Sequence, residues 1–235
     1  MKINRSDILA HIKGGLIVSV QAEKSEPLGK PEFLAAVAEA AVLGGAIAIR
    51  ACYPENIIAI RRAVNVPVIG IYKKQYPDSE VIISPRWEDN WAVVQSEPDI
   101  IALDATFRRR PDDERLESIY YKLREKSDAL LMADVSTFKE GTAAAAMGFD
   151  LVSTTLAGYT NSTTAMDEYS PDFELLEKLC REIGDRVPVV AEGRIWEPHQ
   201  ARQAIDLGAF AVVIGSAISR PWLITRRFVQ ALKPS

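Results

Sequence analysis

Short apolar segments alternate with predicted helices along the whole chain, and this alternation is the feature that most restricts the fold. Each apolar segment has the length of a strand and is apolar almost throughout, which is typical of parallel strands that are buried on both faces. Strands that alternate with helices imply a parallel sheet. The eight apolar segments are 16–21, 46–50, 67–73, 99–104, 129–134, 150–154, 189–192 and 212–214.

Eight strand–helix units in 235 residues favour an α/β fold with one closed (β/α)8 barrel, a TIM barrel, that spans residues 1–235 as a single domain. An open doubly wound sheet is the alternative. The loop that begins at Gln21, after the first apolar segment, lacks the G-x-G-x-x-G sequence of dinucleotide-binding sheets, and this weakens the alternative.

The predicted helices have the residues that usually mark helix ends. Proline begins several of them and glycine ends others. Thr137, with Glu140 three residues later, has the spacing of a capping box. The polar stretch 158–170 predicts a long loop. The predicted helices are 31–44, 54–64, 88–96, 113–125, 138–148, 172–183, 198–207 and one last helix that runs to residue 232.

Charge and composition argue against several classes of protein. The formal net charge of −4 argues against general nucleic-acid binding. No run of 18 or more apolar residues is present, so we expect no membrane span. Residues 1–7 lack the apolar core of a signal peptide.

The cysteines and histidines predict neither a disulfide scaffold nor a metal site. Cys52 and Cys180 are the only cysteines, which suits a reducing cytoplasm, and we interpret both as structural thiols. His11 and His199 lie far apart, and no Cys/His cluster has the spacing of metal ligands. We therefore expect a cytoplasmic protein without a bound metal.

Polar or charged residues stand at the ends of most predicted strands. In a barrel, all carboxyl ends of the strands meet at one face, where active sites form. One charge after an apolar strand is normally just a solvated strand end, but several together predict a polar ring that can hold a polyhydroxylated anion. The ring consists of Gln21, Arg50, Lys73, Asp104, Asp134, Glu192 and Gly215-Ser216.

Lys73 is the predicted reactive group of this ring. Burial and a neighbouring cation such as Arg50 would lower its pKa, and a neutral lysine is a base or a Schiff-base nucleophile. Lys74 should face the opposite way. Glu192 is the predicted second proton-transfer group or carbonyl polariser, and the competing interpretation is a salt bridge to Arg194 or Arg50.

The last two strands predict a phosphate site. Glycine-containing loops after these strands can turn backbone N–H groups towards an anion at a helix start. Arg220 lies close behind Gly215-Ser216, and its forked guanidinium could bind phosphate oxygens in pairs. By contrast, 108–110 is interpreted as a surface charge run. The tryptophans Trp87, Trp91, Trp196 and Trp222 are interpreted as packing residues.

Seven segments in chain order carry a more specific signal. They are 14–21 (GGLIVSVQ), 70–74 (GIYKK), 101–106 (IALDAT), 133–137 (ADVST), 158–160 (GYT), 191–195 (AEGRI) and 215–218 (GSAI) with Arg220-Pro221. Together they resemble the bacterial N-acetylmannosamine-6-phosphate 2-epimerase family, and they span nearly the whole chain.

The resemblance implies a barrel isomerase that interconverts N-acetylmannosamine 6-phosphate and N-acetylglucosamine 6-phosphate in amino-sugar and sialic acid catabolism. It implies a phosphorylated amino sugar as the substrate and no cofactor; barrels of this kind often form homodimers. By resemblance, Lys73 and Glu192 are the catalytic pair. The other matching positions are Gln21, Arg50 and Asp134 at the sugar, and Gly193, Arg194, Gly215, Ser216 and Arg220 at the phosphate end.

The chain departs from the family pattern in two places. Asp112-Asp113 stands where Asp-Gly is expected, and Ser96-Glu97-Pro98 replaces a turn that contains glycine. Both departures are expected to lie off the site and to affect loop shape more than chemistry.

Inversion at C2 of an N-acetylated sugar explains why these residue types are needed. A proton must leave a carbon next to a carbonyl, so the ring must open at C1, and the enolate needs a donor or a cation near its oxygen. A neutral base, an acid and a phosphate anchor meet these needs. The alternatives are a Schiff-base aldolase acting through Lys73 and a phosphosugar sensor without activity.

Overall fold

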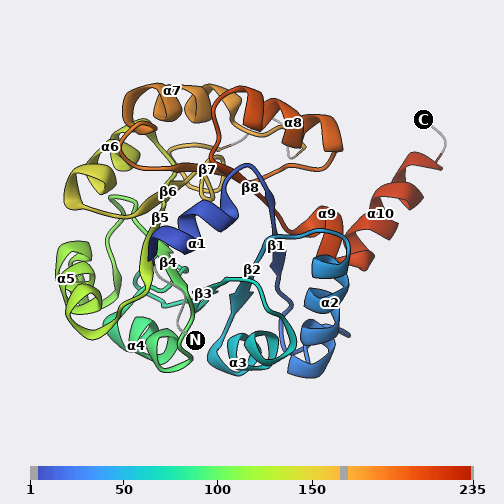
Figure 1. Cartoon of the computed structure of the whole chain (residues 1–235), viewed down its shortest axis with the longest axis horizontal. Coiled ribbons are helices and arrows are strands. Elements are labelled where there is room, and N and C mark those ends of the chain that lie inside the picture. The colour runs from blue at the N-terminus through green and yellow to red at the C-terminus, as the bar shows by residue number, and fades with distance from the viewer. Residues whose placement is uncertain (1–4, 165–168, 234–235) are drawn as a thin grey trace.

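Eight parallel strands close into a barrel with helices around it (Figure 1). The computed structural model describes residues 5–164 and 169–233, so residues 165–168 of the predicted polar loop lie outside the described residues. Strands pair in chain order and β8 pairs with β1, which confirms the predicted TIM barrel. The strands are β1 (Leu16–Val20), β2 (Ala48–Cys52), β3 (Val68–Ile71), β4 (Ile100–Asp104), β5 (Leu130–Asp134), β6 (Leu151–Ser153), β7 (Val189–Glu192) and β8 (Ala211–Ile214).

The helices surround this barrel in chain order, apart from α1 and α10. They are α1 (Arg5–Ile12), α2 (Pro31–Leu43), α3 (Pro54–Ala63), α4 (Trp87–Gln95), α5 (Leu116–Lys126), α6 (Phe138–Met147), α7 (Phe173–Ile183), α8 (Pro198–Asp206), α9 (Ser216–Ser219) and α10 (Pro221–Ala231), with a short 3-10 helix η1 (Pro111–Asp113) before α5. None of the described helices is long and apolar enough to cross a membrane.

The strands divide their side chains between two cores, because successive residues of a strand point to opposite faces. One core fills the barrel and contains Ile17, Ile69 and Ile100. The other lies between the sheet and the helices and contains their neighbours in sequence, such as Val18 and Ile101. The polar residues that continue the inner series are therefore directed into the barrel near the carboxyl ends of the strands.

Helix α1 closes the end of the barrel opposite those polar residues. Ile8 and Ile12 are buried and belong to the inner core, and α1 lies across the barrel in Figure 1. No helix was predicted for these residues. Arg5–Ile12 is only eight residues long and places just two side chains in the core, which is a weak periodic signal.

Two strands differ from their predicted bounds in a way that matters for the site. The second strand was predicted at 46–50, but β2 is Ala48–Cys52, so Arg50 lies inside it and pairs in register with Ser19 and Ile69. The third was predicted to reach Lys73, but β3 ends at Ile71. A charged residue usually marks the end of a buried strand. Arg50 is an exception, because the carboxylates that pair with it lie inside the barrel.

The capping box that the sequence predicts is present. Thr137 accepts a hydrogen bond from the Glu140 backbone N–H at 3.3 Å, and the Glu140 carboxylate accepts one from the Thr137 N–H at 2.8 Å. The predicted last helix is present as α10, and the short helix α9 before it, separated from it at Arg220, was not predicted. The residue before a proline is disfavoured in helical conformation, and Arg220 has φ −121° and ψ 79°.

Both departures from the family pattern have the backbone conformation that glycine favours. Asp112, Asp113 and Glu97 have φ of 53°, 55° and 51°. Glu97 lies between α4 and β4, at the end of the barrel away from the strand carboxyl ends. Asp112-Asp113 lies between β4 and α5, on the same side as the predicted site, but the ion pairs of these residues go to Arg86 and Arg109. Both departures therefore lie off the predicted site residues, as expected, although Asp112-Asp113 is on the same side of the barrel.

The tryptophans do not share one role. Trp87 packs against the outer core and stacks on Trp91 at 5.7 Å between ring centroids. Trp196 packs edge-on against Tyr169. Trp222, in α10, is 45% exposed and carries the Arg226 guanidinium over its ring, so the interpretation as a packing residue is wrong for it in the described chain.

Candidate active site

Arg50 joins two acidic residues from distant strands inside the barrel. Its guanidinium bonds both oxygens of Asp134 from β5, at 3.0 and 2.5 Å, and Glu192 Oε2 from β7, at 2.9 Å. Arg50 and Asp134 are fully buried. Burial alone would lower the pKa of Arg50, but the two carboxylates reverse this effect and raise it. The guanidinium is therefore a fixed positive charge in the mouth of the barrel.

Lys73 lies two residues beyond β3 and within electrostatic reach of the same charges. Its pKa is lowered, chiefly by burial and further by the Arg50 and Arg220 guanidinium groups, while Cys52 and Glu192 oppose the shift. The next residue, Lys74, is exposed and places its ammonium over the Tyr76 ring at 4.6 Å. The two lysines face different environments, as predicted, although neither belongs to the strand.

Glu192 has the opposite shift. Burial raises its pKa, Arg50 opposes the rise, and the Asp134 carboxylate adds to it. The competing interpretation of Glu192 as an ion-pair partner is correct for Arg50. Lys73, with its lowered pKa, and Glu192, with its raised pKa, act electrostatically on each other and form a pair suited to moving protons at neutral pH.

Arg194 holds a loop. It was expected beside Glu192, but its guanidinium donates to the backbone oxygens of Ala157 and Ser170 and lies over the Tyr159 ring at 5.3 Å. Its backbone is left-handed, with φ 57°, and Gly193 before it has φ 115°. This turn carries the chain sharply away from β7, so the Arg194 side chain leaves the mouth.

Gln21, Gly215 and Arg220 come together between β1 and β8. The Gln21 side-chain amide donates to Ser19 Oγ at 2.7 Å, and its Oε1 is buried without a hydrogen-bond partner in the described chain. Arg220 Nε donates to the Gln21 backbone oxygen at 3.4 Å. A Cβ on Gly215 would lie 3.3 Å from the Ser19 Cβ, a tight contact that would require Ser19 to shift by a few tenths of an ångström. Ser216 begins the short helix α9.

The residues that follow β6 also reach the site, although they were not among the predicted site residues. Thr155 Oγ1 lies 2.7 Å from Asp134 Oδ1 and 2.9 Å from Glu192 Oε2. Thr154 bonds the backbone of Glu192 in both directions, at 3.0 and 3.1 Å. The available signal was the run Ser153-Thr154-Thr155 at a strand end, since neutral polar residues there reach the same face as the charged ones.

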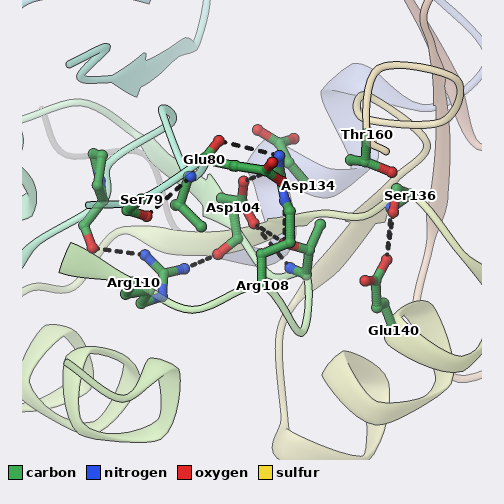
Figure 2. Close-up of polar contacts among 12 residues, drawn as sticks. Ser79, Glu80, Asp104, Arg108, Arg110, Asp134, Ser136, Glu140 and Thr160 are labelled. Atoms are coloured by element: carbon green, nitrogen blue, oxygen red, sulfur yellow. Dashed lines mark hydrogen bonds and ion pairs between the residues drawn. The ribbon is translucent and has the colours of Figure 1, made fainter. Parts of the chain in front are cut away.

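A second polar cluster lies on the same face, at the end of β4, and it corrects the interpretation of 108–110 (Figure 2). Arg108 bonds Asp104 at 2.6 Å and the Glu80 backbone oxygen at 3.1 Å. Arg110 is buried and donates to the backbone of Asp104 and of Pro85. Only Arg109 behaves as a surface charge, paired with an exposed aspartate.

Burial shifts the pKa values of this second cluster in opposite directions. It raises the pKa of Asp104 against the effect of Arg108, and it lowers the pKa of Arg110. The cluster also joins the loops around the mouth. Glu140 accepts from the Phe107 N–H at 3.1 Å and from Ser136 Oγ at 2.8 Å (Figure 2).

The cysteines and acidic residues do not assemble a metal site in the described part of the chain, where no group of three His, Cys, Asp or Glu could hold an ion. Cys52 is buried at the end of β2, and burial raises the pKa of its thiol to about 11. Burial raises the pKa of Cys180 to about 11 as well. Both are free thiols that stay protonated at neutral pH.

Known proteins are similar to this chain over most of its length. The family model "NanE: Putative N-acetylmannosamine-6-phosphate epimerase" matches residues 34–234. A protein of Caldanaerobacter subterraneus subsp. tengcongensis, named as a 2-epimerase of the same kind, is 46% identical over 228 residues, which are 97% of this chain and 94% of the relative. An Oceanobacillus iheyensis protein of the same name is 44% identical over 223 residues, covering 94% of this chain and 100% of the relative.

A solved structure is also similar. It is the N-acetylmannosamine-6-phosphate 2-epimerase from Clostridium perfringens, which superposes with a TM-score of 0.91 at 43% identity and covers 96% of each chain. The family match spans most of the chain, and the relatives match nearly its whole length. The chain therefore belongs to the N-acetylmannosamine-6-phosphate epimerase family.

Proposed function

We propose that this protein is an N-acetylmannosamine-6-phosphate 2-epimerase that interconverts N-acetylmannosamine 6-phosphate and N-acetylglucosamine 6-phosphate. One observation carries the proposal beyond family membership: Lys73, with a lowered pKa, and Glu192, with a raised pKa, lie close enough for each charge to act on the pKa of the other. Proton abstraction next to a carbonyl requires a base and an acid or hydrogen-bond donor, and these pKa shifts favour the neutral amine of Lys73 and the protonated carboxyl of Glu192.

The reaction proceeds on the open-chain sugar. Neutral Lys73 takes the proton from C2, the electrons of the C–H bond move to form the C1–C2 double bond of an enolate, and negative charge develops on O1. Glu192 and the Arg50 guanidinium stabilise that charge by a hydrogen bond and by electrostatic attraction. Return of a proton to the other face of C2 restores the aldehyde and gives the other epimer. Gln21 and Asp134 bind the sugar chain.

The phosphate binds between β7, β8 and the start of α10. We assign Gly193, Gly215 and Ser216 to it through their backbone, and Arg220 through its guanidinium. We place Arg194 at this end as the residue that holds the loop beneath the phosphate, because its side chain already binds two backbone oxygens. A fixed phosphate keeps the flexible open chain aligned with Lys73.

We also infer that two copies of the chain associate, and we place the protein in the cytoplasm. Helix α10 buries none of its residues and lies outside the ring of the other helices in Figure 1. Phe228 and Val229 of α10 are 70% and 51% exposed, and Leu232, directly after the helix, is 85% exposed. A second copy that covers these side chains would remove the exposed apolar surface from water.

Proton NMR of N-acetylmannosamine 6-phosphate with the protein in deuterated water tests the function. We expect the C2 proton signal to disappear and signals of N-acetylglucosamine 6-phosphate to grow, with deuterium at C2. Unphosphorylated N-acetylmannosamine serves as the control and should react far more slowly. Wild-type protein that leaves both the C2 proton and the epimer ratio unchanged would refute the proposal.

A further inference from the structure

The hydroxyl of Thr155 lies between the two carboxylates of the candidate active site. Its Oγ1 is 2.7 Å from Asp134 Oδ1, 2.9 Å from Glu192 Oε2 and 2.8 Å from Ser153 Oγ. A threonine hydroxyl carries one hydrogen and two acceptor lone pairs. One hydrogen therefore serves two carboxylates, and the Ser153 hydroxyl can donate to Thr155 in turn.

The residues after β6 hold Glu192 on one side only. Within residues 5–164 and 169–233, the recorded hydrogen bonds of the Glu192 carboxylate go to Oε2, from Arg50 and from Thr155. The neighbouring Thr154 fixes the Glu192 backbone with one bond in each direction. The backbone and one carboxylate oxygen are thus held, which leaves Oε1 as the oxygen available to another group.

We propose that Thr155 is a positioning residue of this active site: its hydroxyl holds Glu192 Oε2 towards Arg50 and Asp134 and so presents Oε1 to the sugar. The inference rests on the proposed function, in which Glu192 acts on the substrate. Thr155 acts through Glu192, and a carboxylate that lost this contact could rotate and leave the reacting carbon.

The proposal has an electrostatic consequence that can be measured without substrate. Burial raises the pKa of Glu192, and the Thr155 hydrogen bond opposes that rise because it stabilises the charged form. The charged and titratable groups that also face Glu192 are Arg50 from β2, Lys73 beyond β3, Asp134 from β5 and Tyr159 beyond β6. A change confined to the Thr155 hydroxyl leaves all of these groups in place.

The direct test is a ¹³C NMR titration of glutamate-labelled protein without ligand, with the Glu192 signal assigned by its loss in Glu192→Gln. We expect Thr155→Val to move the Glu192 titration to higher pH and Thr155→Ser to restore it. The matched control is Thr142→Val, since the Thr142 hydroxyl is on α6 and bonds only the Lys139 backbone oxygen among the described contacts. Equal titrations in wild type, Thr155→Val and Thr155→Ser would overturn the proposal.

Two further measurements separate positioning from folding and from the proposed function. Thr155→Ala removes the same hydroxyl without an added methyl group and replaces Thr155→Val if that variant does not fold. In the epimerase assay, we expect kcat of Thr155→Val to fall about ten- to a hundredfold with little change in KM. This factor corresponds to the loss of one hydrogen bond to a charged group.

The pH profile of the same variants supplies the last readout. The limb set by Glu192 should move to higher pH in Thr155→Val, while the limb set by Lys73 stays, and Thr155→Ser should behave like wild type. Unmoved limbs with equal changes in kcat and KM would mean that Thr155 only packs, which overturns the proposal. If wild type shows no epimerisation, the proposed function fails, and the titration without ligand still decides the role of Thr155.

Discussion

Arg50 and Asp134, 84 residues apart in the chain, form a bidentate ion pair inside the barrel, with N–O distances of 3.0 and 2.5 Å. The side chains are 1% and 0% exposed. A buried charge is costly unless it is paired and hydrogen-bonded. The pair therefore fixes Arg50 at the centre of the site. The carboxylates of Asp134 and Glu192 beside it depend on its positive charge for compensation.

Removal of the Arg50 charge should destabilise the fold. Arg50→Met leaves Asp134 and Glu192 without their buried partner, which typically costs about 3–5 kcal/mol of unfolding free energy. Urea denaturation of the wild type and the variant measures this loss. The control is Arg109→Met, whose solvent-exposed pair with Asp113 should contribute far less to stability than the buried pair. Similar losses in both variants would mean that the buried pair has no special role in stability.

Lys73→Ala should nearly abolish epimerisation while the protein stays folded, because the variant lacks the base that takes the C2 proton. General-base catalysis typically contributes ~10²–10⁴-fold. Turnover is followed by proton NMR, and folding by circular dichroism. Lys74→Ala, at an exposed neighbouring position, is the matched control and should keep wild-type turnover. Retention by Lys73→Ala of more than about a tenth of wild-type turnover would exclude Lys73 as the essential base.

Glu192→Gln should lose activity. Its stability relative to the wild type should nevertheless increase as the pH rises. The pKa of Glu192 is raised in the folded protein above its ordinary 4.5. The folded state then binds the proton more tightly than the unfolded state, so this contribution is fully present below the unfolded pKa and is lost as pH rises through the folded pKa. Glutamine is neutral throughout and escapes the loss.

Thermal unfolding of wild type and Glu192→Gln at several pH values from about 4 to 8 measures this effect. The difference in Tm, variant minus wild type, should become more positive with rising pH. A difference that becomes more negative would show that Glu192 is stabilised as a carboxylate and that the assignment as an acid is wrong.

Arg220→Ala should weaken binding of the 6-phosphate sugar by roughly ten- to a hundredfold, since one charged hydrogen-bonding group contributes on the order of 1.5–3 kcal/mol. Binding of unphosphorylated N-acetylmannosamine should barely change. Paired calorimetric titrations of wild type and variant give both values. If both ligands lose affinity equally, Arg220 maintains the shape of the loop through its contact with Gln21, and the phosphate assignment fails.

Charges placed on α10 should separate the inferred dimer. The double variant Phe228→Asp with Leu232→Asp puts carboxylates on the side chains that a second copy would cover, and sedimentation should then report a single chain of 25.9 kDa. Wild type should sediment as two chains. Lys178→Ala, on the exposed surface of α7, should leave the dimer intact. Wild-type protein that sediments as one chain would refute the inference.

The order of elements and the face that carries the polar residues could be predicted from the sequence. Uninterrupted apolar segments identify buried parallel strands, and their regular spacing leaves a barrel as the compact solution. Lys73 and Glu192 could be nominated because they stand at or just beyond strand ends. These features depend on the local sequence pattern alone, so they can be recognised without knowing which residues come into contact in the fold.

Only the tertiary structure decided which polar groups meet. Arg50 was predicted at a strand end and Arg110 at the surface, yet both are buried, because acceptors from distant segments compensate their burial. The position of Thr155 between Asp134 and Glu192 depends on the pairing of β5, β6 and β7 in the closed barrel. Local sequence shows that a group is polar, whereas its partner and its pKa depend on closure of the barrel, which sets the distances between segments far apart in the chain.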